Sequence, residues 1–96
     1  MRIIDNPENQ MGRLQDGWQL TDGGRRLERN DRFPDFTSAL LFVNAVGHHA
    51  EAMDHHPDIT LGYGRCTIAL TTHDAGGLTE RDFQLAERID TLKPDA

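Results

Sequence analysis

The sequence predicts an α+β fold, in which a four-stranded antiparallel sheet carries two helices packed on one face. Two pairs of short segments alternate between apolar and polar residues and are joined by glycine-containing turns, which is typical of β-hairpins. Each pair is followed by a longer stretch whose apolar residues recur at spacings of three and four, which is typical of a helix. The 96 residues fit one domain, spanning residues 1–96.

The first hairpin is expected within residues 17–33. Trp18 and Leu20 alternate with polar residues, as in a half-buried strand. An Asp-Gly-Gly turn signal at 22–24 precedes the return strand over 25–33. The residues before this hairpin are weakly patterned and predict no more than a short N-terminal helix.

The longest helical pattern follows Pro34. Asp35 is its candidate N-cap residue. The helix must end near Asp54, because Pro57 cannot continue it and favours an extended conformation for the residue before it. The apolar stripe predicted to face the core is Phe36, Leu40, Val43, Val46, Ala50 and Met53.

The second hairpin is the clearest in the chain. Apolar residues alternate over 59–63 and again over 66–70, with Gly64 and Arg65 between them. A glycine at the first central position of a two-residue turn favours type II′.

The last helix has a strong start signal. Thr79 as N-cap residue places Asp82 at the third helical position, which is a variant of the capping box. Pro94 is expected to end this helix.

The charge balance argues against a nucleic-acid partner. Asp and Glu number 16 against 10 Lys and Arg, for a net charge of −6, and an acidic chain is poorly suited to phosphate backbones. Acidic residues interrupt the single basic cluster, so it is predicted to be a solvated hairpin face. This cluster consists of Arg25, Arg26, Arg29 and Arg32.

Neither a membrane location nor a disulfide is expected. No apolar run approaches membrane-spanning length and no signal-peptide core is present near the N-terminus, so a cytoplasmic location is the default expectation. Cys66 is the single cysteine and is expected to be a small buried apolar residue. The core of so small a domain is modest, which favours a homo-oligomer, either a dimer or a tetramer.

Histidines supply the candidate chemistry. All five lie between positions 48 and 73, and His55 and His56 fall where the long helix ends and a strand begins. Such a junction can hold side chains rigidly and leave them accessible. Glu51 lies four residues before His55, which is a helical spacing that would let the carboxylate orient the ring. If the second hairpin returns His73 to this place, three imidazoles and a carboxylate share one cleft, which suits general acid–base catalysis.

Several of these residues also have a structural explanation. The end of a helix favours a cationic histidine electrostatically, and the capping box alone accounts for Asp82. His48 and His49 lie in mid-helix and are expected to be surface residues. A metal site is a weaker alternative, because His49 and Glu51 cannot share a helix face and no HExxH spacing occurs. Nucleophilic catalysis has no support, because Cys66 lies in mid-strand and no GxSxG motif is present.

The spacing of these residues resembles the signature of the pterin-4a-carbinolamine dehydratases. Neighbouring residues over 54–57, 70–73 and 77–82 resemble the family as well, and the resemblance covers about residues 17–92. It implies an α+β fold with a four-stranded antiparallel sheet and helices on one side. The matching pattern is Glu51-x3-His55-His56-Pro57-x5-Tyr63-x9-His73-x8-Asp82.

The resemblance implies an enzyme, a hydro-lyase that needs no metal or organic cofactor. Its reaction removes water from 4a-hydroxytetrahydropterin to give quinonoid dihydropterin, which recycles the cofactor of aromatic amino-acid hydroxylases. His55, His56 and His73 would then be the acid–base candidates, Glu51 would orient or bind the pterin, and Asp82 would support the site through His73. The positions expected to bind the pterin are Asp54, His55, His56, Pro57, Thr71, Thr72 and His73.

The main alternative is a non-catalytic binding protein on the same scaffold. Animal relatives in the family also act as dimerisation cofactors for a homeodomain transcription factor, and another branch resembles a Rubisco assembly factor. Such chaperone-like relatives are expected to have lost catalytic positions. All five polar positions are present here, so the sequence favours catalysis on a pterin.

Overall fold

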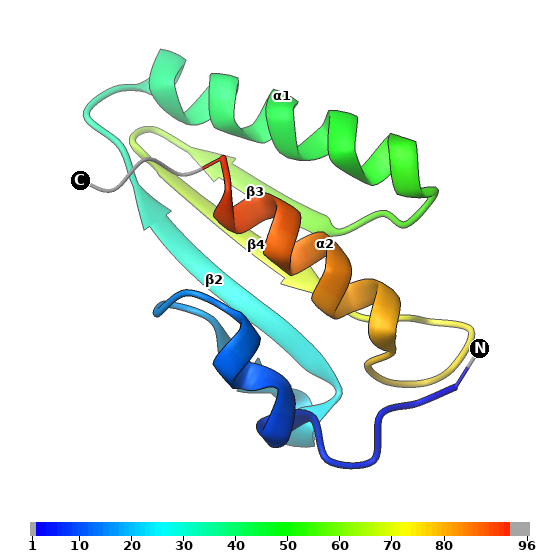
Figure 1. Ribbon diagram of the computed structural model, residues 1–96. Helices are drawn as coiled ribbons and strands as arrows, with labels where there is room; N and C mark the ends of the chain where they lie inside the picture. The colour runs from blue at the N-terminus through cyan, green and yellow to red at the C-terminus, as the bar shows by residue number, and fades with distance from the viewer. Residues whose placement is uncertain (1, 93–96) are drawn as a thin grey trace.

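The computed structural model describes residues 2–92 of the chain (Figure 1). None of the helices in this part is long and apolar enough to cross a membrane. The expectation that Pro94 ends the last helix lies outside the described residues. In chain order the elements are η1 (Pro7–Arg13), β1 (Gln19–Thr21), η2 (Asp22–Gly24), β2 (Arg26–Arg32), α1 (Phe36–Met53), β3 (Asp58–Gly62), β4 (Arg65–Leu70) and α2 (Glu80–Asp90).

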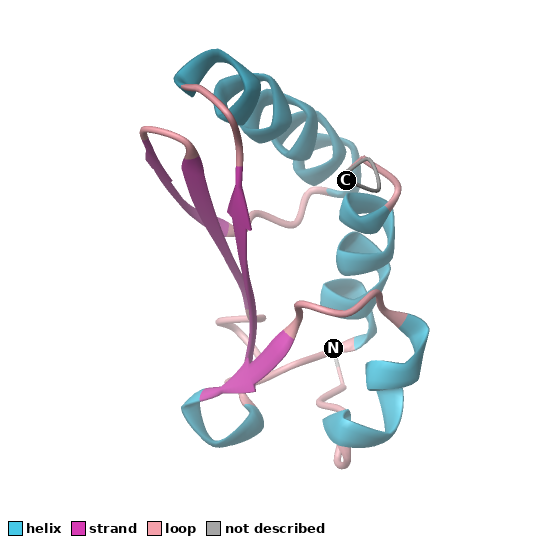
Figure 2. Ribbon diagram, turned by 90° about the vertical axis from the view of Figure 1, so that its left-hand side faces the viewer, coloured by secondary structure: helices cyan, strands magenta, loops and turns pink. Residues whose placement is uncertain are grey.

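The four strands form one antiparallel sheet in the order β1-β2-β4-β3. Both α-helices cover the same face of this sheet, and Figure 2 shows the sheet nearly edge-on with the helices to one side. The predicted α+β architecture with two hairpins is therefore confirmed. Because β2 and β4 are the central strands, the two hairpins meet in the middle of the sheet.

The core lies between the sheet and the two α-helices. Each buried large apolar side chain in it stabilises the fold by about 1.5–3 kcal/mol. The sheet contributes Leu27, Cys66, Ile68 and Leu70. The helices contribute Phe42 and Val46 from α1 and Phe83, Leu85 and Ile89 from α2. This packing fixes the start of α2 against the end of β4. The loop that joins these two elements belongs to the candidate site.

Helix α1 begins where the sequence predicts, but its inward face differs in the first half. Asp35 caps the helix by accepting a hydrogen bond from the Ser38 backbone N–H at 2.8 Å, which lowers the pKa of the Asp35 carboxyl. Phe36 and Leu40 are 43% and 38% exposed instead of buried. The stripe that faces the core is Ala39, Phe42, Val46 and Ala50.

The error in the stripe has a simple cause. Leu40, Leu41, Phe42 and Val43 are four consecutive apolar residues, so two different series satisfy helical spacing. Only packing against the sheet separates the two, and it places Phe42 beside Phe33 with ring centroids 5.3 Å apart.

The turn of the second hairpin is shifted by one residue from the prediction. Gly62 pairs with Arg65, so Tyr63 and Gly64 are the two central residues. Gly64 has a φ of 67° and Tyr63 does not have a positive φ. A positive φ at the second central position alone is the pattern of a type II turn, and the predicted type II′ turn is wrong.

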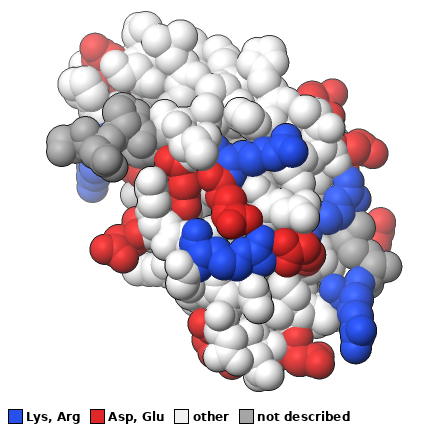
Figure 3. Space-filling model, viewed as in Figure 1, with Lys and Arg blue, Asp and Glu red and all other residues white. Residues whose placement is uncertain are grey.

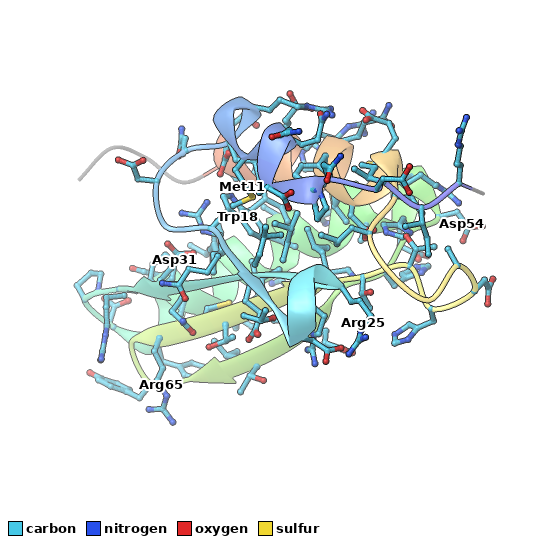
Figure 4. All side chains as sticks on the ribbon, turned by 90° about the horizontal axis from the view of Figure 1, so that it is seen from below. Met11, Trp18, Arg25, Asp31, Asp54 and Arg65 are labelled. Atoms are coloured by element: carbon cyan, nitrogen blue, oxygen red, sulfur yellow. The ribbon has the colours of Figure 1, made fainter. Side chains whose placement is uncertain are left out.

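The predicted solvated arginine face is wrong at Arg29, which is buried. Its guanidinium donates to Asp31 at 2.7 and 2.9 Å and to Asp90 at 2.6 Å, and it lies over the Trp18 ring. Trp18 Nε1 donates to the same Asp90 oxygen at 2.7 Å. Figure 4 shows Trp18 and Asp31 in the same half of the molecule. This network joins β2 to the end of α2.

A second ionic contact ties η1 to α2. Arg13 donates to Glu80 at 2.6 and 2.7 Å and to Glu87 at 2.7 Å. The Arg13 guanidinium holds the pKa of the Glu80 carboxyl below its ordinary value. Since Glu80 is 53% exposed, we expect this pair to contribute less than about 1 kcal/mol.

This contact predicts a small loss of stability in acid. The pKa of Glu80 is lower in the folded chain, so its contribution is complete above the ordinary glutamate pKa and is lost as pH falls through the folded-state pKa. Urea unfolding of the wild type and of Arg13→Met should be measured from about pH 6 to about pH 3, a range that spans the ordinary pKa of glutamate. The difference between the two proteins in the free energy of unfolding should shrink as the pH falls. A difference that stays constant with pH would contradict the assignment.

Candidate active site

An open cavity of about 510 Å³ lies at one end of the molecule. It is bounded by the end of α1, the loop after β4 and the start of α2. Figure 4 shows Asp54 on this side, next to the loop that follows β4. The residues that line it are Asp54, His55, His56, Thr71, Thr72, His73, Asp74 and Arg81.

The backbone at the end of α1 sets the position of His55. Asp54 is in the left-handed conformation, with φ 51° and ψ 45°. The His55 N–H donates to the Ala50 carbonyl oxygen at 3.0 Å, and the Asp54 N–H donates to the Glu51 carbonyl oxygen at 3.1 Å. These two bonds are those of a Schellman motif, which usually has glycine at the left-handed position. Aspartate tolerates this conformation better than most residues do.

Arg81 holds the same helix end from the side of α2. Its guanidinium donates to the Met53 carbonyl oxygen, and to that of Asp54 at 3.3 Å. The last carbonyls of a helix have no partner within the helix, so this cation satisfies groups that would otherwise need water. Arg81 therefore links the first turn of α2 to the peptide that carries His55.

A buried carboxylate holds the His55 ring. Asp82 is fully buried, and its Oδ1 lies 2.6 Å from His55 Nε2. Its Oδ2 accepts from the Thr72 hydroxyl at 2.7 Å and from the Thr79 backbone N–H at 2.9 Å. The predicted capping box of Thr79 and Asp82 is thus confirmed. The same side chain also contacts His55.

This arrangement fixes the tautomer of His55. Asp82 already accepts two donors on Oδ2, so as a carboxylate it takes the Nε2 proton of His55 on Oδ1. Nδ1 is then the ring nitrogen that remains for exchanging a proton. Because His55 is 8% exposed and lines the cavity, its ring is held rigidly and still meets the open space.

Glu51 pairs with His56, and the predicted pairing with His55 is wrong. Glu51 Oε2 contacts His56 Nε2, and both side chains are largely exposed. The helical spacing of four fails here because α1 ends at Met53 and the left-handed Asp54 turns the chain before His55 is reached. Glu51 itself does not line the cavity.

His73 reaches the cavity from the loop after β4. It follows β4 in a turn held by the bond from the Thr72 N–H to the Gly77 carbonyl oxygen at 3.0 Å. Its side chain is exposed and lines the cavity. The expectation that Asp82 acts through His73 is wrong, because the hydrogen bond of Asp82 goes to His55.

The structure brings most of the predicted residues together. The three candidate histidines, with Asp54, Thr71 and Thr72, line the cavity, whereas Pro57 does not. Asp82 and Glu51 lie behind His55 and His56, respectively. His48 and His49 lie within α1 away from the cavity. Within residues 2–92, no group of three or more His, Cys, Asp or Glu side chains is placed to hold one metal ion.

Two lining residues, Asp74 and Arg81, were missed at the level of sequence. Arg81 stands inside the capping-box segment, where a charged residue on the first turn of a helix is unremarkable. The signal that could have found it is its place beside Asp82, one residue before the carboxylate that reaches the site. Asp74 follows His73 directly and carried no separate signal.

This site, with three imidazoles around one cavity and one of them held by a buried carboxylate, is of the kind found in enzymes that move protons. The chain belongs to the pterin 4 alpha carbinolamine dehydratase family, whose sequence model matches residues 5–92. This family is one of hydro-lyases, as the sequence resemblance implied.

Curated relatives match most of the chain. A Cyanothece protein named "Putative pterin-4-alpha-carbinolamine dehydratase" is 48% identical over 84 residues, covering 88% of this chain and 84% of the relative. A protein of the same name from Acidobacterium capsulatum is 56% identical over 75 residues, covering 78% of this chain and 79% of the relative.

Solved structures confirm the fold. The crystal structure of a transcriptional coactivator/pterin dehydratase from Brucella melitensis is 34% identical, with a TM-score of 0.85 over 96% of this chain and 98% of that one. A pterin dehydratase-like protein described as a RuBisCO assembly factor in the alpha-carboxysome has a TM-score of 0.70 over 81% of this chain and 90% of that one. The second is 23% identical and shows the shared fold alone.

Proposed function

We propose that this protein removes water from 4a-hydroxytetrahydropterin to give quinonoid dihydropterin, using histidines as general acid and base. The observation that carries the proposal is the cavity of about 510 Å³ that His55, His56 and His73 line together. Family membership and the names of the relatives support the same substrate class.

The proposed reaction needs one proton delivered and one removed. The 4a-hydroxyl group takes a proton and leaves as water, while a ring nitrogen of the pterin loses a proton, so atoms and charge balance without oxidation or reduction. Imidazole titrates near neutral pH and can do either task. His55, through Nδ1, and His73, through either ring nitrogen, are the groups that we propose exchange these protons, with His56 as a third candidate.

Asp82 and Glu51 are proposed as positioning residues, because each reaches the cavity through a histidine. Asp82 fixes the tautomer and orientation of His55 from a fully buried position. Glu51 restrains His56 at the surface, where solvent weakens its effect. Backbone groups at 54–56 and 71–73 would hold the pterin ring in the cavity.

The deciding experiment is a direct rate measurement. A pterin-dependent hydroxylase generates the carbinolamine, and its dehydration is followed by absorbance with and without the protein. We expect acceleration above the spontaneous rate. A rate that is unchanged by the protein at any concentration would refute the proposed function.

Asp82→Asn tests the positioning role. The amide keeps the shape of the side chain but loses the charge, so we expect a loss of about 1–3 kcal/mol in the free energy of unfolding from the disturbed buried bonds. Because the tautomer of His55 is no longer imposed, kcat/KM should fall by about 10- to 100-fold and its pH profile should shift. A purely structural carboxylate would lower stability but leave the pH profile of the folded enzyme in place.

The non-catalytic alternative rests on one of the similar structures, whose description names a transcriptional coactivator besides a pterin dehydratase. The cavity does not favour it, because a binding role does not require three imidazoles around one space. Copurification with a transcription factor or with Rubisco, combined with an unchanged dehydration rate, would support it.

We also propose that the chain is a homo-oligomer that associates through α1. Phe36, Leu40 and Leu41 are exposed on this helix, and Glu51 is the single charged residue within it. Figure 3 shows few charged side chains over α1 on the face that it displays. Two copies of an uncharged helix face can pack about a two-fold axis without bringing like charges together, so a second copy is the partner that this surface fits.

Leu41→Glu tests this interface. Leu41 is 64% exposed, so the substitution should leave the isolated fold within about 0.5 kcal/mol of wild type. We expect light scattering to show the wild type as an oligomer and the Leu41→Glu variant as a smaller species. Thr37→Glu, which places the same charge on the first turn of the same helix, should weaken the association less. A wild type that is monomeric at high concentration would refute the proposal.

A further inference from the structure

Residues 2–5 form an N-terminal segment that lies against the loop between β4 and α2. The Ile4 N–H donates to the Leu78 carbonyl oxygen at 2.8 Å. The neighbouring Ile3 forms an isolated antiparallel bridge with Thr79. Figure 1 shows this segment, in blue, next to the loop that leads into α2. The segment therefore makes a short strand-like contact with a loop that is more than seventy residues away in the sequence.

The two isoleucines of the N-terminal segment are placed differently. Ile4 is half-buried and packs against the core cluster. Ile3 is 42% exposed, and its side chain covers Gly77, because a Cβ atom added to this glycine would lie 3.5 Å from Ile3 Cδ1. Both isoleucines precede residues 5–92, the part that the family model matches, so family membership implies nothing about their role.

The loop residues that the segment contacts form the base of the turn that carries His73. The Gly77 carbonyl oxygen accepts from the Thr72 N–H at 3.0 Å. The Thr72 hydroxyl lies 2.9 Å from the Thr79 hydroxyl. Because His73 follows Thr72 directly, the place of its backbone depends on where Gly77 and Thr79 hold Thr72. The N-terminal segment contacts both of these holding residues.

The first hairpin holds the other side of the same turn. The Thr71 hydroxyl donates to the Arg25 carbonyl oxygen at 2.7 Å. An open space of about 340 Å³, instead of a packed layer, lies between the N-terminal segment and the turn of this hairpin. The loop is thus held at two separate points, and releasing the segment would free one of them while the other remains.

We propose that the N-terminal segment is a positioning element for the reaction, which acts by holding the turn that presents His73 to the cavity. The inference rests on the proposed function, because the place of His73 affects the rate only if this residue exchanges a proton with the substrate. Such an exchange needs heavy atoms within about 2.6–3.2 Å of one another. A misplacement of about 1 Å can lower a rate by about 100-fold, so a contact remote from the substrate can control the reaction.

A double-mutant cycle tests whether the segment acts through His73. Deletion of residues 2–5 should lower kcat/KM by about 10- to 100-fold in the otherwise wild-type chain. In the His73→Ala background the same deletion should cost distinctly less, because the side chain that it positions is already absent. A general loss of folding would cost the same in both backgrounds, so an equal fold-loss would overturn the proposal.

Substitutions at Ile3 keep the proposal testable if the deletion variant folds poorly. Ile3→Ser removes the apolar cover from Gly77 and should lower kcat/KM, though less than the deletion does. Ile3→Val keeps a branched apolar side chain there and should stay near the wild-type rate. The matched control is Arg2→Ser, which changes an exposed side chain of the same segment and should leave the rate unchanged. Equal rates in Ile3→Ser and the wild type would overturn the role of Ile3.

Amide hydrogen exchange separates the hold on the turn from the reaction. The Thr72 N–H should exchange at least about 10-fold faster in the deletion variant, because its bond to Gly77 opens more often, whereas amides in the middle of β4 should keep their rates. Faster exchange with an unchanged kcat/KM would overturn the positioning role alone. No acceleration of the dehydration by the wild type would overturn the proposed function, and the exchange of Thr72 would then decide whether the segment holds the turn.

Discussion

His73→Ala is expected to lower kcat/KM for the dehydration by 10²- to 10⁴-fold (about the usual contribution of one acid–base group) and to leave the fold intact. His73 is exposed on the loop after β4 and lines the cavity. Removing an exposed side chain of this kind changes the free energy of unfolding by no more than about 0.5 kcal/mol. The variant should therefore unfold at nearly the wild-type temperature and still be a poor catalyst.

His55→Ala should give the same loss of activity with an additional loss of stability. The His55 ring is buried against Asp82, so its removal leaves one oxygen of a fully buried carboxylate without its partner. Such an unmet acceptor costs about 1–3 kcal/mol. The two variants thus distinguish His55, on which the stability of the fold depends, from His73, on which it does not.

His48→Ala is the matched control for both. It removes an imidazole from α1, away from the cavity, and should change neither rate nor stability. Steady-state kinetics and thermal unfolding of the three variants test the assignment. Wild-type rates in both His55→Ala and His73→Ala would refute the proposed acid–base roles.

The layout of the fold was predictable because each signal in the sequence is local. The capping box at Thr79 and the N-cap at Asp35 mark helix starts within three residues of chain, and alternation marks the strands. The same locality explains the errors. The inward face of the first half of α1 depends on which of two apolar series meets the sheet, and that choice is made by packing with Phe33.

The candidate site was predictable in membership but not in pairing. A motif spacing brings His55, His56 and His73 to one place without saying which carboxylate each one contacts. Glu51 meets His56 because a left-handed residue interrupts the helix, and aspartate at position 54 gives a weaker signal of that turn than glycine would. Asp82 meets His55 through a contact 27 residues apart in sequence, which no local pattern encodes.

Arg29→Met is expected to cause the largest loss of stability of any single substitution considered for this chain, about 3–5 kcal/mol. The guanidinium is buried between Asp31 and Asp90, so the apolar side chain would take the counter-charge of Arg29 away from two buried carboxylates. Small domains have a total free energy of unfolding of only about 5–15 kcal/mol. The variant should therefore unfold at a much lower temperature or denaturant concentration.

Arg32→Met is the control for this change, because Arg32 lies on the same strand and is exposed. Equal stabilities of the two variants would contradict the role of the buried network.

A triple variant shows whether the loss of stability in Arg29→Met comes from unpaired buried charge or from a packing defect. In Arg29→Met combined with Asp31→Leu and Asp90→Asn, no charge of this network remains buried. The amide oxygen introduced at position 90 can still accept from Trp18 Nε1, as the carboxylate does at 2.7 Å. Replacing a buried ionic group by neutral residues of similar volume is often close to neutral in free energy. We therefore expect this triple variant to recover most of the stability that Arg29→Met loses, whereas a packing defect at position 29 would leave it as unstable as the single variant.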